Sequence, residues 1–389
     1  MLETTGFHII SKDNPYLVLT NILIIIILYL VLRPSTKDNC QQQFFYPRKI
    51  KIATALIFIF CIFSFWGGDW FHYIKDFHNV KTNSYRYHLE NVYIWIIKYL
   101  SPNYITFRLY VWGTSILIAF AIFKRTSINY SHVLFFFSLC FLIWFSYSRV
   151  SLALAILFLG FTIIINNLPS TNLHTLFFGW FLIAISFFFH KSAFFGIFMC
   201  TLVILTKDFR RQYILLTVFS IPIIIIFMER FLDQLMIVDL SSESGDFESN
   251  LIAAQQYLTR STRSGINIRL LIGHLLERIP YYLTAFICLL MYFHKDFYVI
   301  PKDIKAYLKL TFFLVLGASI FAFNLGHNTS ILYTKFIRFT SIPCAIVLTW
   351  MWENKYYRRL TLYTIYIAIM SVSYTLIYTF YARLISLPE

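Results

Sequence analysis

Long apolar segments recur along the whole chain, and they contain almost no charged residues. The runs Ile22–Leu32 and Phe181–Phe189 are typical. Of the 389 residues, 59% are hydrophobic and only 13% are charged, whereas roughly a quarter of the residues in a soluble domain are charged. A membrane-spanning helix needs about 20 mostly apolar residues, and a membrane β-barrel would need strands of alternating polarity. The sequence therefore predicts an all-α, polytopic integral membrane protein.

We expect about twelve transmembrane helices within a single transmembrane domain that covers residues 1–389. The stretch 86–100 is different, because it mixes aromatic and aliphatic residues with Arg86, Glu90 and Lys98. We interpret it as a helix that lies in the membrane interface. The apolar segments fall at about 15–32, 50–66, 106–123, 132–147, 151–167, 174–189, 193–206, 213–228, 279–294, 307–323, 336–351 and 360–380.

The basic residues predict the orientation of these helices, because short cytoplasmic loops of membrane proteins are enriched in lysine and arginine. The loop after the first segment contains Arg33, Lys37, Arg48, Lys49 and Lys51. Alternation from there places two long loops on the external side. We expect an interfacial helix in the loop 67–105 and an amphipathic helix in the loop 229–278. The net charge of +15 then reflects cytoplasmic loops and anionic lipid rather than nucleic acid.

Polar residues at the external ends of the helices are the candidate site residues, since placing them at a membrane boundary is costly. An aspartate and a tyrosine follow two glycines after the second segment. An arginine and a histidine each interrupt a pair of apolar segments, and further basic residues precede later helices. The set consists of Asp69, Tyr73, Arg149, His190, Lys191, Arg278, Lys335 and Arg338.

Each of these residues also has a purely structural explanation. Asp69 can cap the turn after Gly68, and Arg149 can extend to a lipid headgroup. A single histidine at a membrane boundary is more often structural than catalytic. The convergence of Arg149, His190 and Arg338 on one predicted face of the membrane favours a functional site over these explanations.

The chemistry of this set suits transfer of a group from a lipid diphosphate to an alcohol. Guanidinium groups bind phosphates bidentately, so we predict Arg149 and Arg338 as diphosphate ligands. A neutral imidazole can accept a proton from a hydroxyl group, so His190 is predicted to act as the general base or to position the acceptor, and Asp69 is the alternative base. The sequence shows no metal-ligand spacing or nucleotide-binding loop, and we expect no metal and no cofactor. The supporting substrate-binding residues are predicted to be Lys191, Lys335, Arg278 and Tyr73.

At these positions the chain resembles the EpsG/Wzy group of O-antigen and capsular polysaccharide polymerases. One departure is Phe339, which follows Arg338 where the family often has tyrosine. The resemblance covers the order of the motifs over about residues 66–340. It lies in Gly67-Gly68-Asp69 followed by Tyr73, in Arg149 with Ala153, in Phe189-His190-Lys191-Ser192-Ala193, and in Arg338 at the start of a late helix.

The resemblance implies an enzyme of the bacterial inner membrane whose active site faces the periplasm. Its helical architecture would be related to lipid-linked glycosyltransferases of the GT-C type. The implied reaction joins undecaprenyl-diphosphate-linked oligosaccharide repeat units by metal-independent glycosyl transfer. Its implied partners are that lipid-linked oligosaccharide, membrane lipid and a chain-length regulator protein, with no nucleic acid. The alternatives are an O-antigen ligase, a lipid-linked oligosaccharide flippase and, less favoured, a polysaccharide acyltransferase.

Overall fold

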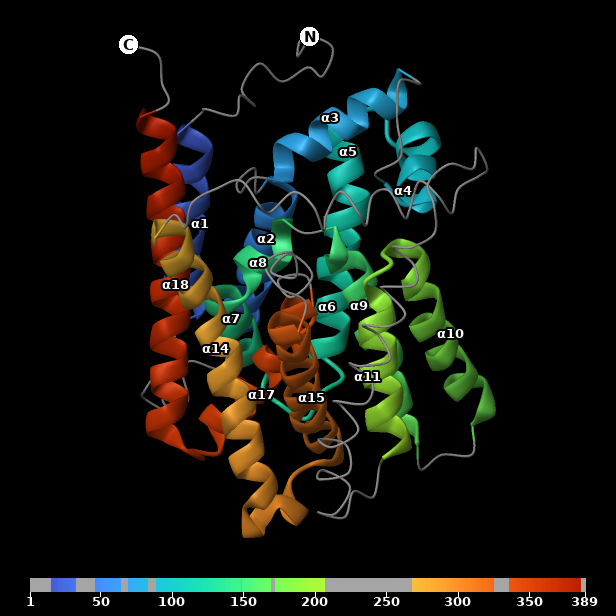
Figure 1. The fold of residues 1–389 in the computed structure, drawn as a ribbon, viewed down its shortest axis with the longest axis vertical. Helices are drawn as coiled ribbons and strands as arrows, with labels where there is room; N and C mark the ends of the chain where they lie inside the picture. Colours follow the sequence, from blue (N-terminus) through green and yellow to red (C-terminus); the bar gives the residue numbers. More distant parts are fainter. Residues whose placement is uncertain are drawn as a thin grey trace.

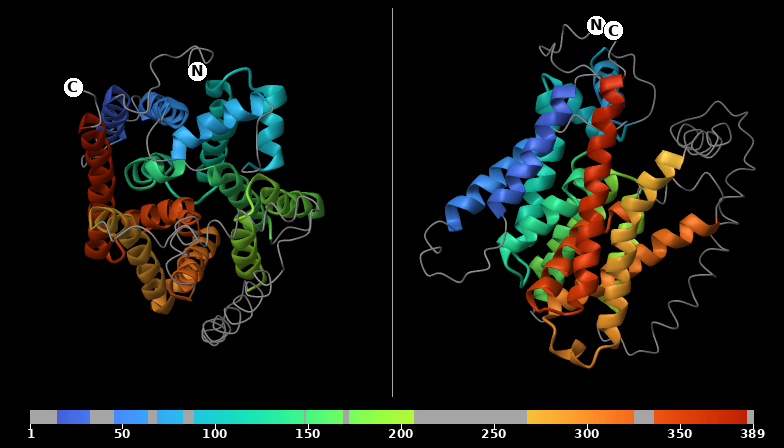
Figure 2. Two further views of the ribbon diagram at one scale, coloured as in Figure 1. Left: turned by 45° about the horizontal axis from the view of Figure 1, so that its top comes forward. Right: turned by 90° about the vertical axis from the view of Figure 1, so that its left-hand side faces the viewer.

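The computed structural model describes residues 15–32, 46–63, 69–82, 89–147, 149–168, 172–206, 268–324 and 336–385. The regular secondary structure in these ranges is helical, without a strand, and the all-α class is confirmed. Most of the helices run largely along the long axis of the molecule, and helix α3 lies across their upper end (Figure 1). Helices α1 and α2 are tilted together relative to α18 (Figure 2).

The predicted apolar segments coincide with described helices, apart from the segment 213–228, which lies outside the described residues. The bounds of the first half are α1 (Pro15–Leu32), α2 (Tyr46–Phe63), α3 (Asp69–Lys81), α4 (Asn91–Trp95), η3 (Ile96–Leu100), α5 (Tyr104–Arg108), η4 (Leu109–Gly113), α6 (Thr114–Phe123), α7 (Tyr130–Cys140) and α8 (Leu142–Tyr147). Those of the second half are α9 (Val150–Asn167), α10 (Leu173–Phe189), α11 (Ala193–Leu205), α14 (Ile268–Phe293), η6 (Lys295–Val299), α15 (Lys302–Asn324), α17 (Ser341–Glu353) and α18 (Arg358–Ile385).

Two described helical stretches, Tyr104–Phe123 and Val150–Asn167, are long and apolar enough to cross a membrane. Further apolar helices are shorter, among them Leu173–Phe189 and Ala193–Leu205. Large apolar side chains on outer helices are exposed, such as Leu30 at 65% and Phe177 at 74%. Exposed apolar surface on this scale is expected in contact with lipid rather than with water. The count of about twelve spans and the GT-C-like architecture stay predictions.

The predicted external loop 67–105 contains α3, α4 and η3. Helix α3 buries Tyr73, Ile74, Phe77 and Val80, a spacing of three to four residues that places them on one face of the helix. The opposite face is polar, which explains why α3 lies across the bundle end and not inside it. Of the second predicted loop, 229–278, only the part from residue 268 onward is described, where α14 begins.

Close contact between α9 and α10 determines where the ends of these two helices lie. A Cβ atom on Gly160 would come within 2.5 Å of the carbonyl oxygen of Gly179, so only glycine allows the backbones to approach this closely. Because the two helices are antiparallel, the N-terminus of α9 and the C-terminus of α10 lie at the same end of the bundle (Figure 1). Residues 149 and 190 occupy these two helix ends.

Candidate active site

Three ionisable side chains from separate segments meet at the bundle end where α9 begins and α10 ends. Arg149 Nη1 lies 3.5 Å from Glu90 Oε2, and His190 Nε2 lies 3.7 Å from Glu90 Oε1. The side chains of Arg149 and Glu90 are only 15% and 14% exposed. Glu90 therefore connects the predicted diphosphate ligand to the predicted base. We call Glu90, Arg149 and His190 the Glu90 cluster.

Two tyrosines fix the position of Arg149. The guanidinium carbon lies 5.0 Å from the centre of the Tyr73 ring, and the Tyr93 hydroxyl donates a hydrogen bond of 2.9 Å to the Arg149 carbonyl oxygen. Burial disfavours the guanidinium, but Tyr73 and then Glu90 outweigh this effect, and the pKa of Arg149 is raised above its ordinary value. Arg149 is thus a permanently charged group whose backbone and side chain are both held.

The hydrogen bonds of His190 determine its tautomer. The backbone N–H of Ser192 lies 3.1 Å from His190 Nδ1, and the Ser192 hydroxyl lies 2.5 Å from the same atom. Because a backbone N–H can only donate, Nδ1 is the acceptor in this pair. A neutral His190 therefore carries its proton on Nε2, the nitrogen that faces Glu90. In this arrangement His190 is a donor toward Glu90 rather than a proton acceptor.

A fully buried arginine, Arg108, forms hydrogen bonds to the ends of two helices near the Glu90 cluster. Its Nε donates to the Ile62 carbonyl at 2.5 Å, and Nη2 donates to the carbonyls of Cys61 at 2.7 Å and Ser146 at 3.4 Å. These carbonyls belong to the last turns of α2 and α8, where intrahelical donors run out. The guanidinium carbon also lies 4.4 Å from the centre of the Trp112 ring. Arg108 thus joins the helix end before α3 to the helix end before Arg149.

We expect Arg108→Met to destabilise the protein strongly, because three buried carbonyl groups lose a charged donor. Losses of about 2–4 kcal/mol are typical when a buried hydrogen-bonded charge is removed. Arg125→Met is the matched control, since Arg125 Nη1 also donates to a helix carbonyl, that of Ala121 at 3.0 Å, but is exposed. The melting temperature in detergent should fall by many degrees for Arg108→Met and hardly change for Arg125→Met. Equal melting temperatures for the two variants would contradict this role.

The other predicted site residues are placed less fully. Asp69 is the first residue of α3, but its side chain lies outside what the structure describes. Lys335 lies outside the described residues. Lys191 is exposed beside His190, and Arg278 is half-buried in α14, two residues before Pro280. No test of their predicted substrate-binding roles follows from these positions.

The segment that carries Arg338 packs against the start of α11, close in sequence to His190. Phe336 stacks on Phe195, with ring centres 4.5 Å apart, and a Cβ atom on Gly196 would come within 2.9 Å of the Phe339 ring. Phe339, where the family often has tyrosine, is completely buried. A buried hydroxyl would need a partner there, so phenylalanine suits this packing.

Four residues of this region were not among the predicted site residues. In the sequence, Glu90 is only a polar residue of an amphipathic stretch, and Arg108 lies within the predicted apolar segment 106–123. No sequence pattern singles out Tyr93 or Ser192, although Ser192 lies within the Phe-His-x-Ser-Ala motif. A serine two residues after a histidine at a helix end can be recognised in the sequence, and it predicts the contact between the Ser192 hydroxyl and His190 Nδ1.

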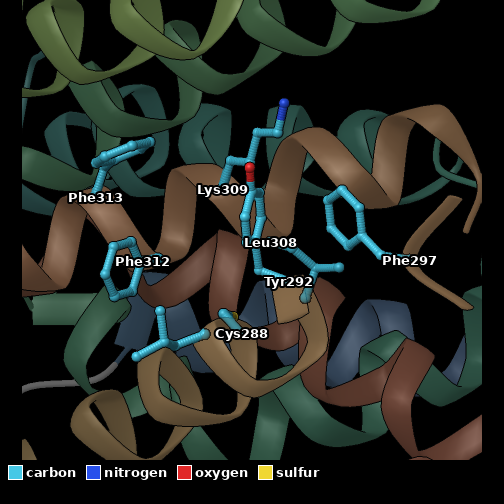
Figure 3. A pocket seen from close by; sticks show the side chains of 8 residues that line it. Cys288, Tyr292, Phe297, Leu308, Lys309, Phe312 and Phe313 are labelled. Carbon is cyan, nitrogen blue, oxygen red and sulfur yellow. The ribbon is translucent and has the colours of Figure 1, made fainter. Parts of the chain in front are cut away.

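A small cavity between α14 and α15 does not resemble a substrate site. Its volume is about 20 Å³, and it is lined mainly by rings and aliphatic groups, including Tyr292, Phe312 and Phe313. The Lys309 ammonium points away from these rings (Figure 3), and it lies 3.4 Å from the Thr206 carbonyl. A space of this size holds little more than one water molecule. Within the described residues, no group of three metal-ligating side chains is present either.

The sequence model of the EpsG family matches residues 49–386. The chain belongs to the EpsG family. The matched range includes the Glu90 cluster and Arg108, and the predicted resemblance is confirmed. No match is found among curated proteins or among solved structures. Membership of the EpsG family supports a polysaccharide polymerase-like membrane protein with glycosyltransferase-type activity.

Proposed function

We propose that this EpsG-family protein is a surface polysaccharide polymerase. It would join undecaprenyl-diphosphate-linked oligosaccharide repeat units at the periplasmic face of the bacterial inner membrane. The observation that carries the proposal is the Glu90 cluster, in which a charged guanidinium and a carboxylate lie 3.5 Å apart at the end of an apolar bundle. A glycosyl transfer from a lipid diphosphate needs both groups: a cation for the leaving group and an acceptor for the proton.

The reaction balances with these groups alone. A hydroxyl oxygen on the non-reducing sugar of one lipid-linked repeat attacks the anomeric carbon of the growing chain. The bond between that carbon and the diphosphate oxygen breaks, and its electron pair leaves with the lipid diphosphate. The hydroxyl proton passes to a carboxylate. A single direct displacement inverts the configuration at the anomeric carbon, because the hydroxyl attacks opposite the leaving diphosphate. Retention would require a carboxylate nucleophile and a second displacement.

Arg149 would bind the departing diphosphate. Negative charge accumulates on this leaving group in the transition state, and a fixed cation at that place lowers the barrier. Because the side chains of Arg149 and Glu90 are largely buried, electrostatic attraction to them is stronger than it would be in water. Arg338, Lys335, Lys191 and Arg278 are proposed as further cations for the two diphosphates, with Tyr73 holding Arg149.

Glu90 would accept the proton, and His190 would position the attacking hydroxyl. This assignment follows from the His190 tautomer, since Ser192 occupies Nδ1 and Nε2 carries the hydrogen. Glu90 also contacts Arg149. A donor diphosphate competes for the same guanidinium, so donor binding would release Glu90 for proton transfer. Asp69 is the alternative proton acceptor.

The test is polymerisation by the purified protein with a synthetic lipid-diphosphate-linked repeat unit as sole substrate. We expect a ladder of glycans that differ by one repeat, together with free lipid diphosphate in equal molar amount to the bonds formed. An O-antigen ligase would give no ladder, and it would release lipid diphosphate only after lipid A core was added. A flippase would move the repeat across a vesicle membrane without releasing lipid diphosphate, and either result would overturn the proposal.

A further inference from the structure

A second cavity lies between α2 and α6, with Tyr130 of α7 at its edge. Its volume is about 580 Å³, far above that of the cavity between α14 and α15. It lies along the N-terminal part of α2 and the C-terminal part of α6. Arg108 holds the C-terminal end of α2, so the cavity is separate from the Glu90 cluster. Its lining consists of Ile50, Lys51, Thr54, Ala55, Phe58, Leu117, Phe120, Lys124 and Tyr130.

The lining residues form a groove between two helix faces. Positions 51, 54, 55 and 58 form one face of α2, and positions 117, 120 and 124 one face of α6. Seven to eight residues of helix rise about 12 Å, which sets the length of the groove. At its inner end the Phe58 ring packs over Gly113, within 3.3 Å of a Cβ atom built on that glycine.

The two ends of the groove differ in polarity. Because α2 and α6 are antiparallel, Lys51 and Lys124 come to the same end of the groove, and the far end is formed by Phe58 and Leu117. Lys124 Nζ lies 5.5 Å from the centre of the Tyr130 ring. The N-terminal turns of α2, which contain Arg48 and Lys49, add positive charge to the lysine end.

The groove opens sideways toward apolar surface rather than toward water. Leu117, at its inner end, is 55% exposed, and the neighbouring Ile52 and Ile59 are 52% and 43% exposed. A ligand with a long apolar chain can therefore enter from the lipid phase. The lining around Phe58, Leu117 and Phe120 is hydrocarbon, and Thr54 already donates to the Ile50 carbonyl. The lysine end offers two cations for one phosphate.

We infer that this groove binds an anionic phospholipid. One acyl chain lies between Phe58 and Leu117, and the phosphate lies between Lys51 and Lys124. The charge at one end and the hydrocarbon lining at the other match an amphiphile with a single anionic head. This site is independent of the proposed polymerase reaction, because it uses no residue of the Glu90 cluster.

Native mass spectrometry of the full-length protein tests this site. Detergent-purified protein is incubated with phosphatidylglycerol or phosphatidylethanolamine that carry identical acyl chains. We expect phosphatidylglycerol to be retained preferentially. In Lys51→Gln/Lys124→Gln, its affinity should fall about thirtyfold, the effect of two basic residues next to an anionic headgroup. Lys295→Gln/Lys302→Gln is the matched control, because it removes the same charge from two exposed lysines around η6.

A second variant tests the apolar part of the groove. Ala55→Trp fills the space between Lys51 and Phe58 but keeps both lysines, and it should reduce binding of both phospholipids. Equal retention of the two lipids by the wild-type protein would overturn the inference. So would wild-type affinity of the double glutamine variant, or displacement of bound phosphatidylglycerol by undecaprenyl diphosphate, which would assign the groove to the substrate tail. Melting temperatures of all variants establish that they are folded.

Discussion

Arg149→Ala eliminates the long-chain ladder in the purified polymerisation assay, while the protein remains folded. We expect the rate to fall by about 10²–10³-fold, the range for removal of one group that stabilises charge in a transition state. The physical reason is that Arg149 is held by the Tyr73 ring and by the Tyr93 hydroxyl before any substrate binds. A cation held in place this way needs no reorganisation when the diphosphate leaves.

Two further variants separate charge from geometry at this position. Arg149→Lys keeps the charge but loses the planar fork, so we expect it to retain part of the activity. Arg125→Ala is the control, because Arg125 is an exposed arginine near the groove end of α6. A wild-type ladder from Arg149→Ala would remove this residue from the site. A wild-type rate with altered melting temperature would assign it a structural role.

The sequence predicts much of the helical architecture because apolar runs must form helices in lipid. Helices α9 and α10 follow the predicted segments to within one residue at their ends. The predicted segment 132–147 is different, because it divides at Phe141 into α7 and α8. Neither glycine nor proline marks this break, and Arg108 donates a hydrogen bond to the carbonyl of Ser146 in the short helix that follows it. No local pattern in the sequence marks such a break.

The candidate site shows the same division between local and tertiary information. Arg149 and His190 can be predicted, because a charge between two apolar runs has to lie at a membrane boundary. Glu90 cannot be predicted in this way, since its position in an amphipathic stretch is compatible with simple exposure to solvent. Only the packing of the segment before α4 against α9 and α10 brings its carboxylate between the other two side chains. The tautomer of His190 is likewise visible only from the contact with Ser192.

Glu90→Gln reduces turnover without preventing donor binding. Glutamine keeps the size of the side chain and a carbonyl acceptor for Arg149 and His190, but it cannot take up the hydroxyl proton. Loss of a general base lowers the rate by about 10²–10⁴-fold. Binding of the lipid-diphosphate donor should be unchanged or tighter, because the variant no longer competes for Arg149 with a full negative charge. A rate assay at saturating donor and a separate binding assay measure the two effects.

The chain supplies a matched control for this experiment, because Glu353 forms a second glutamate–histidine pair. Glu353 Oε1 lies 2.7 Å from His132 Nδ1, and the pair joins the start of α7 to the end of α17. Glu353→Gln should leave the rate at the wild-type value. Glu90→Gln should show the full loss of rate at saturating donor while donor binding persists. If Glu90→Gln polymerises at the wild-type rate and Asp69→Asn does not, the proton acceptor is Asp69, and Glu90 serves only to orient Arg149.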